Sequence, residues 1–116
     1  MLRLLKALND AGITIVPGTD ALAGYSLLHE LELYVRAGIP AAQVLRMATL
    51  TSAQVSGADR ERGTVAAGKL ADMILIDGDP TAHIEDVHKI AVVIKGGHVY
   101  DPAQIEAALG IAPRGQ

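Results

Sequence analysis

The stretch Ile13-Thr14-Ile15-Val16-Pro17-Gly18-Thr19-Asp20 combines the pattern of a buried strand with that of a polar loop. Its first four residues are all β-branched, and Pro17 and Gly18 end the run. A short run of this kind after a helix fits a parallel strand buried on both faces better than an amphipathic edge strand. The preceding residues 2–8 predict that helix, because charged residues separate their leucines, and Gly12 stands where a C-cap glycine is expected. Helix, glycine, buried strand and polar loop together predict an α/β unit.

Three helices are predicted to follow the loop. Ser26 is a suitable N-cap for a helix that continues to Ala37, and Pro40 can occupy the first position of the next helix. The sequence Thr51-Ser52-Ala53-Gln54 has the capping-box pattern and predicts the start of another short helix, which ends at Gly57.

The character of the chain changes after Ala58, where a charged connector covers residues 59–62. Residues 73–76 form a strand-like aliphatic run that a turn sequence ends. Gly96-Gly97 lies between two further strand-like runs and predicts a two-residue hairpin. We therefore divide the chain into two parts, residues 1–58 and residues 59–116.

The end of the chain predicts a terminal helix. Asp101, Pro102 and Gln104 have the types expected for the N-cap, the first helical position and the capping-box partner of a helix that continues to Leu109.

Composition excludes several classes of protein. The chain has 116 residues, a formal net charge of −3 and no cysteine, so we expect no disulfides, no zinc knuckles and no nucleic-acid partner. No apolar run approaches the roughly 18 residues of a membrane span, and we expect a cytoplasmic protein without membrane contact. Half of the residues are apolar, yet phenylalanine and tryptophan are absent. A short chain with many small apolar side chains suggests a piece that packs against something larger.

Several motifs in sequence order resemble the metal-dependent amidohydrolase superfamily. One group resembles the end of that family's barrel, and two later segments resemble the return strand and the last hairpin of its small β-sandwich. In this chain the motifs are Gly18-Thr19-Asp20, His29-Glu30-Leu31, Ala37-Gly38-Ile39-Pro40, Ala48-Thr49, residues 63–77 and residues 93–100. Within the superfamily the chain is most similar to the imidazolonepropionase-like and prolidase-like branch.

The resemblance implies the last βα portion of a (β/α)8 barrel, followed by a small β-sandwich segment and a C-terminal helix. A complete barrel of this kind takes about 250 residues, with active-site groups at the ends of several strands. The resemblance therefore implies an incomplete barrel, and we interpret the chain as the C-terminal portion of an amidohydrolase.

Asp20 is the candidate catalytic residue. In the family the matching aspartate binds the metal and takes the proton from the attacking water, and a bound divalent metal lowers the pKa of that water. The alternative is a loop aspartate that caps the following turn. A catalytic metal, with zinc the expected ion, needs about three protein ligands. We therefore expect the isolated chain to bind no metal by itself and to be inactive.

Other polar residues have less specific interpretations. His29 and Glu30 are either substrate-side groups or ordinary helix-start residues, and neither is assigned to the metal. We expect the histidines at positions 83, 88 and 98 to be exposed. Lys69 and Asp72 belong to the sandwich motif, where we expect them to shape turns and strand pairing.

Two functions follow as hypotheses. The first is part of a metal-dependent hydrolase that cleaves an amide, peptide-like or cyclic amide C–N bond in a small substrate, with further metal ligands from sequence outside this chain. The second is a non-catalytic, self-associating interaction module derived from the same fold. Both predict a partner, either further copies of this chain or a complementing barrel chain.

Overall fold

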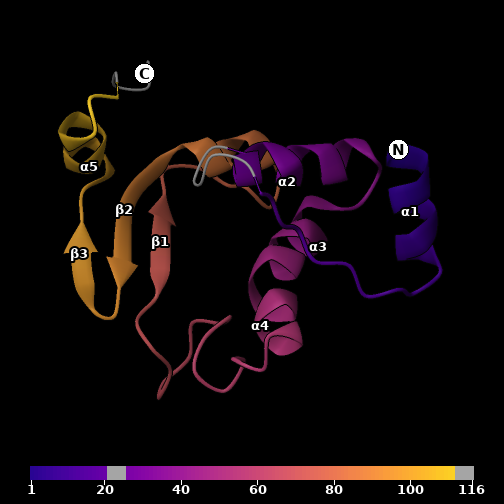
Figure 1. Ribbon diagram of the computed structural model, residues 1–116, viewed down its shortest axis with the longest axis horizontal. Coiled ribbons are helices and arrows are strands. Elements are labelled where there is room, and N and C mark those ends of the chain that lie inside the picture. The colour runs from indigo at the N-terminus through magenta and orange to yellow at the C-terminus, as the bar shows by residue number, and fades with distance from the viewer. Residues whose placement is uncertain (21–25, 112–116) are drawn as a thin grey trace.

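Helices form the first half of the chain, and the second half contains an antiparallel sheet with two further short helices (Figure 1). The computed structural model describes residues 1–20 and 26–111. The helices are α1 (Leu2–Asp10), α2 (Ser26–Arg36), α3 (Ala41–Arg46), the π-helical η1 (Met47–Thr51), α4 (Ser52–Val55), the 3-10 helix η2 (Ile84–His88) and α5 (Pro102–Ala108). The strands are β1 (Met73–Ile76), β2 (Ile90–Lys95) and β3 (His98–Tyr100).

Residues 13–16 are not a strand, which corrects the prediction of a buried parallel strand there. They have no regular secondary structure, and among the described residues none pairs with them in a sheet. Ile13 is 51% exposed. A strand exists only where a neighbouring strand bonds its backbone groups. The β-branched run has the local preference for a strand, and the described part of the chain provides no such neighbour.

The sheet has the strand order β1-β2-β3, with both pairs antiparallel. Met73 lies opposite Ile94, and Val93 lies opposite Tyr100. Gly96 and Gly97 join β2 to β3 with φ values of 57° and 80°. Two consecutive positive φ angles are what a tight hairpin turn between twisted strands requires. The predicted strand at 73–76 and the predicted hairpin are confirmed.

The predicted helix break before Ser52 is wrong, because α3, η1 and α4 follow one another without interruption. Thr51 has helical angles, φ −63° and ψ −41°, and makes no side-chain cap bond. The nearby hydroxyls bond inside the helix instead: Thr49 Oγ1 donates to the Leu45 carbonyl at 2.8 Å and Ser52 Oγ to the Met47 carbonyl at 2.7 Å. Bonds of this kind satisfy a hydroxyl without ending the helix.

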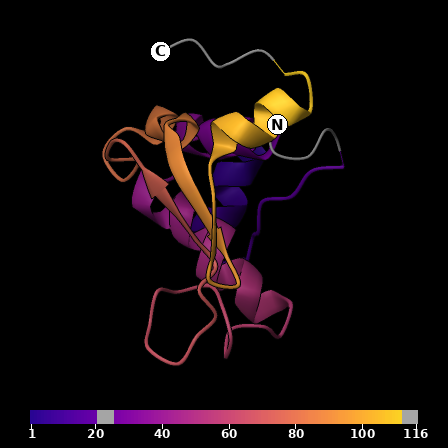
Figure 2. The same ribbon diagram turned by 90° about the vertical axis from the view of Figure 1, so that its left-hand side faces the viewer.

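The terminal helix begins as predicted. The Asp101 carboxylate accepts a bond from the Ala103 amide at 2.9 Å, and Pro102 is the first helical residue. The helix ends at Ala108, one residue earlier than predicted, and packs against β2. Figure 2 shows α5 above the end of the sheet.

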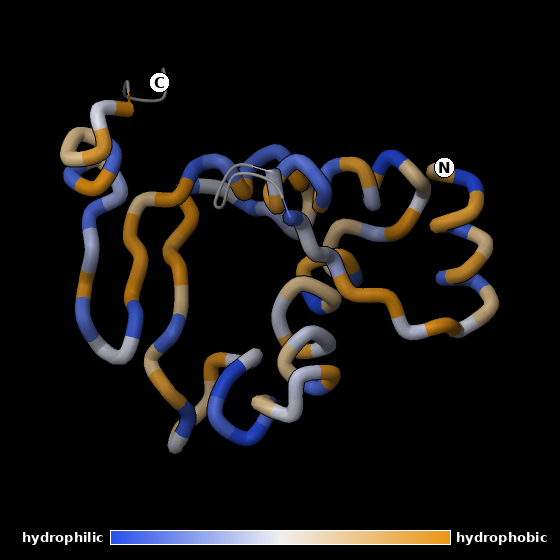
Figure 3. Tube along the Cα trace, in the orientation of Figure 1, coloured by the Kyte–Doolittle hydropathy of each residue, from blue (hydrophilic) through white to orange (hydrophobic). Residues whose placement is uncertain are grey.

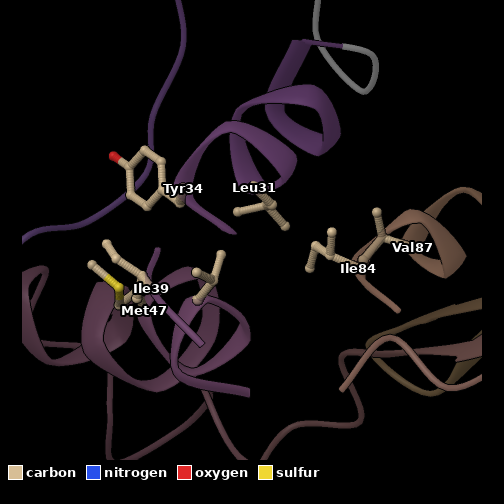
Figure 4. Close-up of a cluster of buried hydrophobic side chains, with 7 residues drawn as sticks. Leu31, Tyr34, Ile39, Met47, Ile84 and Val87 are labelled. Atoms are coloured by element: carbon tan, nitrogen blue, oxygen red, sulfur yellow. The ribbon is translucent and has the colours of Figure 1, made fainter. Parts of the chain in front are cut away.

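One hydrophobic cluster joins the two parts of the chain (Figure 4). Helices from the first half contribute most of it, and η2 from the second half closes it. Its buried members are Leu31, Tyr34, Ile39, Val44, Met47, Ile84 and Val87. Both predicted parts thus share this core, and the boundary at residue 58 stays a prediction.

Much of the remaining apolar surface is uncovered. Ile74 and Leu75 in β1 are 47% and 55% exposed, and Figure 3 shows hydrophobic residues along β1 and β2. Among the described residues, no helix has the length and apolar character needed to cross a bilayer.

Candidate functional site

Asp20 is exposed and lies two residues beyond the Gly18 amide. The four loop residues after it, and Tyr25, lie outside the described residues. The assignment of Asp20 to metal binding and catalysis stays a prediction. The structure does show which side chains contact residues 16–18, the segment just before it.

Glu30 holds this segment from helix α2. Its Oε1 atom accepts a hydrogen bond from the Gly18 amide at 3.1 Å and another from the Tyr34 hydroxyl at 3.0 Å. The Tyr34 hydroxyl also lies 3.5 Å from the Val16 carbonyl oxygen. Glu30 and Tyr34 are four residues apart on one helix, a spacing that places both side chains on the same face. The helix therefore contacts the backbone on both sides of Pro17.

Tyr34 remains a neutral hydrogen-bond donor over the ordinary pH range. Burial of the ring, together with the hydrogen bond to Glu30 and that residue's negative charge, raises the pKa of Tyr34 to about 12. In Figure 4 its hydroxyl points away from the hydrophobic cluster.

A hollow of about 450 Å³ lies beside this network. Aliphatic side chains of α1 and polar groups of α2 line it, the latter including Ser26, His29, Glu30 and Tyr34. Ser26, expected just before the helix, is its first residue. His29 therefore borders a cavity near the Asp20 segment, and both interpretations of His29 remain open.

His88 is not the exposed residue that we expected. Its side chain is 34% exposed, and Nε2 lies 2.7 Å from Glu32 Oε1. The other oxygen of Glu32 lies 3.1 Å from His29 Nδ1. The core contact between η2 and α2 carries His88 toward Glu32, although 56 residues separate them in sequence. His83 and His98 are exposed, as predicted.

The two histidines determine the ionisation of Glu32. Burial by itself would raise the pKa of Glu32, but the hydrogen bonds from His29 and His88 and their charges outweigh burial and lower that pKa below its ordinary value of 4.5. Glu32 thus carries a negative charge near neutral pH between two imidazole rings.

Lys69 and Asp72 have the structural roles expected of them. Lys69 Nζ donates to the Asp59 carbonyl at 2.6 Å, and this bond holds the charged connector in place. Asp72 Oδ1 accepts the Gly96 amide at 2.7 Å and so fixes the hairpin turn. The carboxylate also lies 3.9 Å from both Arg62 and Lys95.

The described residues do not fit a complete metal centre. Within residues 1–20 and 26–111, no group of three or more His, Asp or Glu side chains is placed to hold an ion. The Asp20 carboxylate is suitable as one oxygen ligand, and a catalytic ion needs about three protein ligands.

Comparison with known proteins identifies the family. The model of the amidohydrolase family matches residues 1–100. The chain belongs to the amidohydrolase family. Members of this family are generally metal-dependent hydrolases.

Two curated relatives illustrate the range of this family. The chain is 30% identical over 123 residues to a 5-methylthioadenosine/S-adenosylhomocysteine deaminase of Moorella thermoacetica. The alignment covers 96% of this chain and 25% of the relative. It is 33% identical over 101 residues to an imidazolonepropionase of Rubrobacter xylanophilus, covering 79% of this chain and 24% of the relative. The amidohydrolase chain described here therefore spans about a quarter of the length of these relatives.

Solved structures agree with this placement. A Xaa-Pro dipeptidase with bound methionine superimposes with a TM-score of 0.81 at 29% identity, over 86% of this chain and 25% of the dipeptidase. A putative prolidase from Bifidobacterium longum gives a TM-score of 0.77 at 32% identity, over 91% of this chain and 29% of that protein. These matches confirm the resemblance to the imidazolonepropionase-like and prolidase-like branch.

Proposed function

We propose that this chain forms part of a metal-dependent amidohydrolase that hydrolyses a C–N bond in a small substrate. The observation that carries the proposal is the position of Asp20 directly after the segment held by Glu30, within the 1–100 match to the family. The names of the relatives, two deaminases, an imidazolonepropionase and a Xaa-Pro dipeptidase among them, support cleavage of this bond type.

Asp20 acts in this proposal as general base. Its carboxylate accepts the proton of the water that attacks the substrate carbon, which makes that water a better nucleophile. The same carboxylate is one oxygen ligand of a divalent ion, with zinc the proposed metal, and the other ligands come from outside the described residues. We also propose a cytoplasmic location.

Metal content is the first test of this proposal. The purified chain is stripped with chelator, equilibrated with Zn²⁺, desalted and analysed for ions per chain. We expect little retained metal from the chain alone, because Asp20 provides one ligand. Retention near one ion per chain that Asp20→Asn removes would show that copies of the chain assemble a complete ligand set.

Complementation provides the second test. The chain is co-expressed with the B. longum putative prolidase from which the matching segment has been removed, and hydrolysis of a Xaa-Pro dipeptide is measured with Zn²⁺. We expect turnover with the wild-type chain and a loss of about 10²-fold or more with Asp20→Asn. Glu61→Gln, which changes an exposed carboxylate in the connector, is the control. Equal turnover with Asp20→Asn would remove Asp20 from the mechanism.

The uncovered apolar surface supports the second candidate, a self-associating module. A groove of about 850 Å³ lies between the helical segment around α4 and the strands β1 and β2, and its lining includes Ala53, Val65, Ile74 and Val93. β1 is also an edge strand of four apolar residues without a charge to discourage pairing. We propose that further copies, or a complementing barrel chain, cover this surface.

Molar mass in solution tests the association. Light scattering across a concentration series should give an oligomer for the wild-type chain, and Ile74→Lys should shift it toward monomer because a charged edge strand pairs poorly. Arg60→Glu, a charge change on an exposed residue outside the groove lining, is the control. A monodisperse monomer at high concentration would contradict the proposal.

A further inference from the structure

We propose that Glu30 is a positioning residue, whose carboxylate fixes the backbone that presents Asp20. The inference rests on the proposed role of Asp20, and it adds a residue that the sequence motifs left without an assigned task.

The geometry concentrates two contacts on one atom. Glu30 Oε1 accepts both the Gly18 amide, at 3.1 Å, and the Tyr34 hydroxyl, at 3.0 Å. A carboxylate oxygen has two lone pairs, so one atom can accept both bonds. Only Thr19 separates the anchored Gly18 from Asp20.

Tyr34 restricts the movement of the Glu30 carboxylate, which we call the anchor of Gly18. Its ring is buried in the core, with 8% exposure, and its hydroxyl also faces the Val16 carbonyl oxygen at 3.5 Å. Pro17 lies between the two contacted residues and has a restricted φ angle. Glu30 therefore bonds the Gly18 end of the segment 16–18, the Tyr34 hydroxyl lies beside its Val16 end, and the stiff Pro17 connects the two.

The need for such an anchor follows from the missing sheet partners. Residues 13–16 have no strand among the described residues to locate them. A functional carboxylate must be placed to within about 0.5 Å to act as ligand or base. In this structure the side chains of Glu30 and Tyr34 supply the backbone contacts by which the segment is located relative to helix α2.

Nuclear magnetic resonance of the isotope-labelled chain can measure both the hydrogen bond at Gly18 and the order of the Asp20 side chain. Exchange of the Gly18 amide with solvent reports the anchor, and the Hα–Hβ couplings of Asp20 report whether its side chain keeps one rotamer. With Glu30→Ala we expect Gly18 exchange to rise by roughly 10-fold or more and the Asp20 couplings to move toward averaged values.

Conservative variants separate positioning from general stability. Glu30→Gln keeps an oxygen acceptor, so it should retain most of the Gly18 protection while lowering the pKa of Tyr34 through loss of the negative charge. Glu30→Asp keeps the charge but is one methylene shorter, so it should lose the protection, and it replaces Glu30→Ala if that variant fails to fold. Glu61→Gln, at an exposed position in the connector, should leave both Gly18 and Asp20 unchanged.

Two outcomes would overturn the inference: wild-type exchange at Gly18 in folded Glu30→Asp, or unchanged Asp20 couplings despite faster exchange. Zn²⁺ titration of the complemented enzyme separates this result from the proposed function. If Asp20→Asn binds the ion as well as wild type does, the proposed role of Asp20 fails, whatever the Gly18 amide shows. If Asp20→Asn loses binding while Glu30→Asp changes neither Gly18 nor Asp20, the positioning role alone fails.

Discussion

Glu32 shows how one side chain can connect distant parts of this chain. Its two oxygens contact His29, one turn away on the same helix, and His88, on η2. Both contacts favour the ionised carboxylate, so the pKa of Glu32 is lowered. A carboxyl whose pKa is lower in the folded state stabilises that state above its unfolded pKa, and the stabilisation disappears as pH falls through the folded value.

We therefore predict that Glu32→Gln destabilises the chain at pH 7 and that the difference from wild type shrinks as pH falls below 4.5, the ordinary pKa of the group. Urea unfolding at pH 7, 5 and 3.5 measures this. Glu61→Gln, which changes an exposed carboxylate in the connector, is the control. A difference between Glu32→Gln and wild type that is constant over this range would contradict the assigned contacts.

Asp72 stabilises the hairpin turn through a single hydrogen bond. Its carboxylate accepts the Gly96 amide at 2.7 Å, and the side chain is 23% exposed. Asp72→Ala should lower the free energy of unfolding by about 1–2 kcal/mol, because the turn amide loses a charged acceptor. Asp77→Ala, an exposed position at the other end of β1, should change it by less than about 0.5 kcal/mol. Chemical denaturation of both variants provides the comparison.

The secondary structure elements differ in how far local sequence determines them. The hairpin and α5 follow from local chemistry, because adjacent glycines allow the turn and Asp101-Pro102 starts a helix. The segment 13–16 and the supposed cap at Thr51 could not be settled locally. A strand depends on its neighbour, and a capping-box pattern inside a longer helix is satisfied by bonds within that helix.

Gly63 follows the connector and packs closely against the helical residues Ala53 and Leu50. A Cβ atom there would lie 2.7 Å from Ala53 Cβ, and the residue has φ +94°. Gly68 has a comparable φ, +85°, but open space around it. Gly68→Ala should cost about 1–2 kcal/mol through its backbone angle alone, and Gly63→Ala should cost about 1–3 kcal/mol more because of the clash. Equal losses in thermal or urea unfolding would show that the contact with Ala53 is not tight.

For the whole molecule, the central feature is a small core shared by both parts of the chain. Ile84 and Val87 in η2 are 3% and 2% exposed and belong to the same cluster as Leu31 of α2. The sequence predicted the helix that carries Leu31, but it gave no signal for η2. The sites at Glu30 and Glu32 were missed for the same reason, since their contacts span 12 and 56 residues.

Ile84→Ala tests the dependence of the fold on this core. It should lower the free energy of unfolding by about 2–5 kcal/mol, a large fraction for a chain with few buried residues. Helical and sheet signals should be lost together, because η2 packs in this cluster and also contacts β1. Ile105→Ala, at a position 44% exposed, should have an effect below about 0.5 kcal/mol. Separate transitions for helices and sheet in the wild-type chain would contradict a shared core.

The distance in sequence between α2 and η2 also has a consequence for synthesis on the ribosome. Leu31 and Glu32 leave the exit tunnel long before Ile84 and His88, which cover them in the folded chain. His88 follows Glu32 by 56 positions, which take roughly 3–11 s to translate at about 5–20 residues per second. During that interval the part of the α2 face that η2 covers stays open, and the emergence of η2 marks the earliest moment at which the nascent chain can close its core.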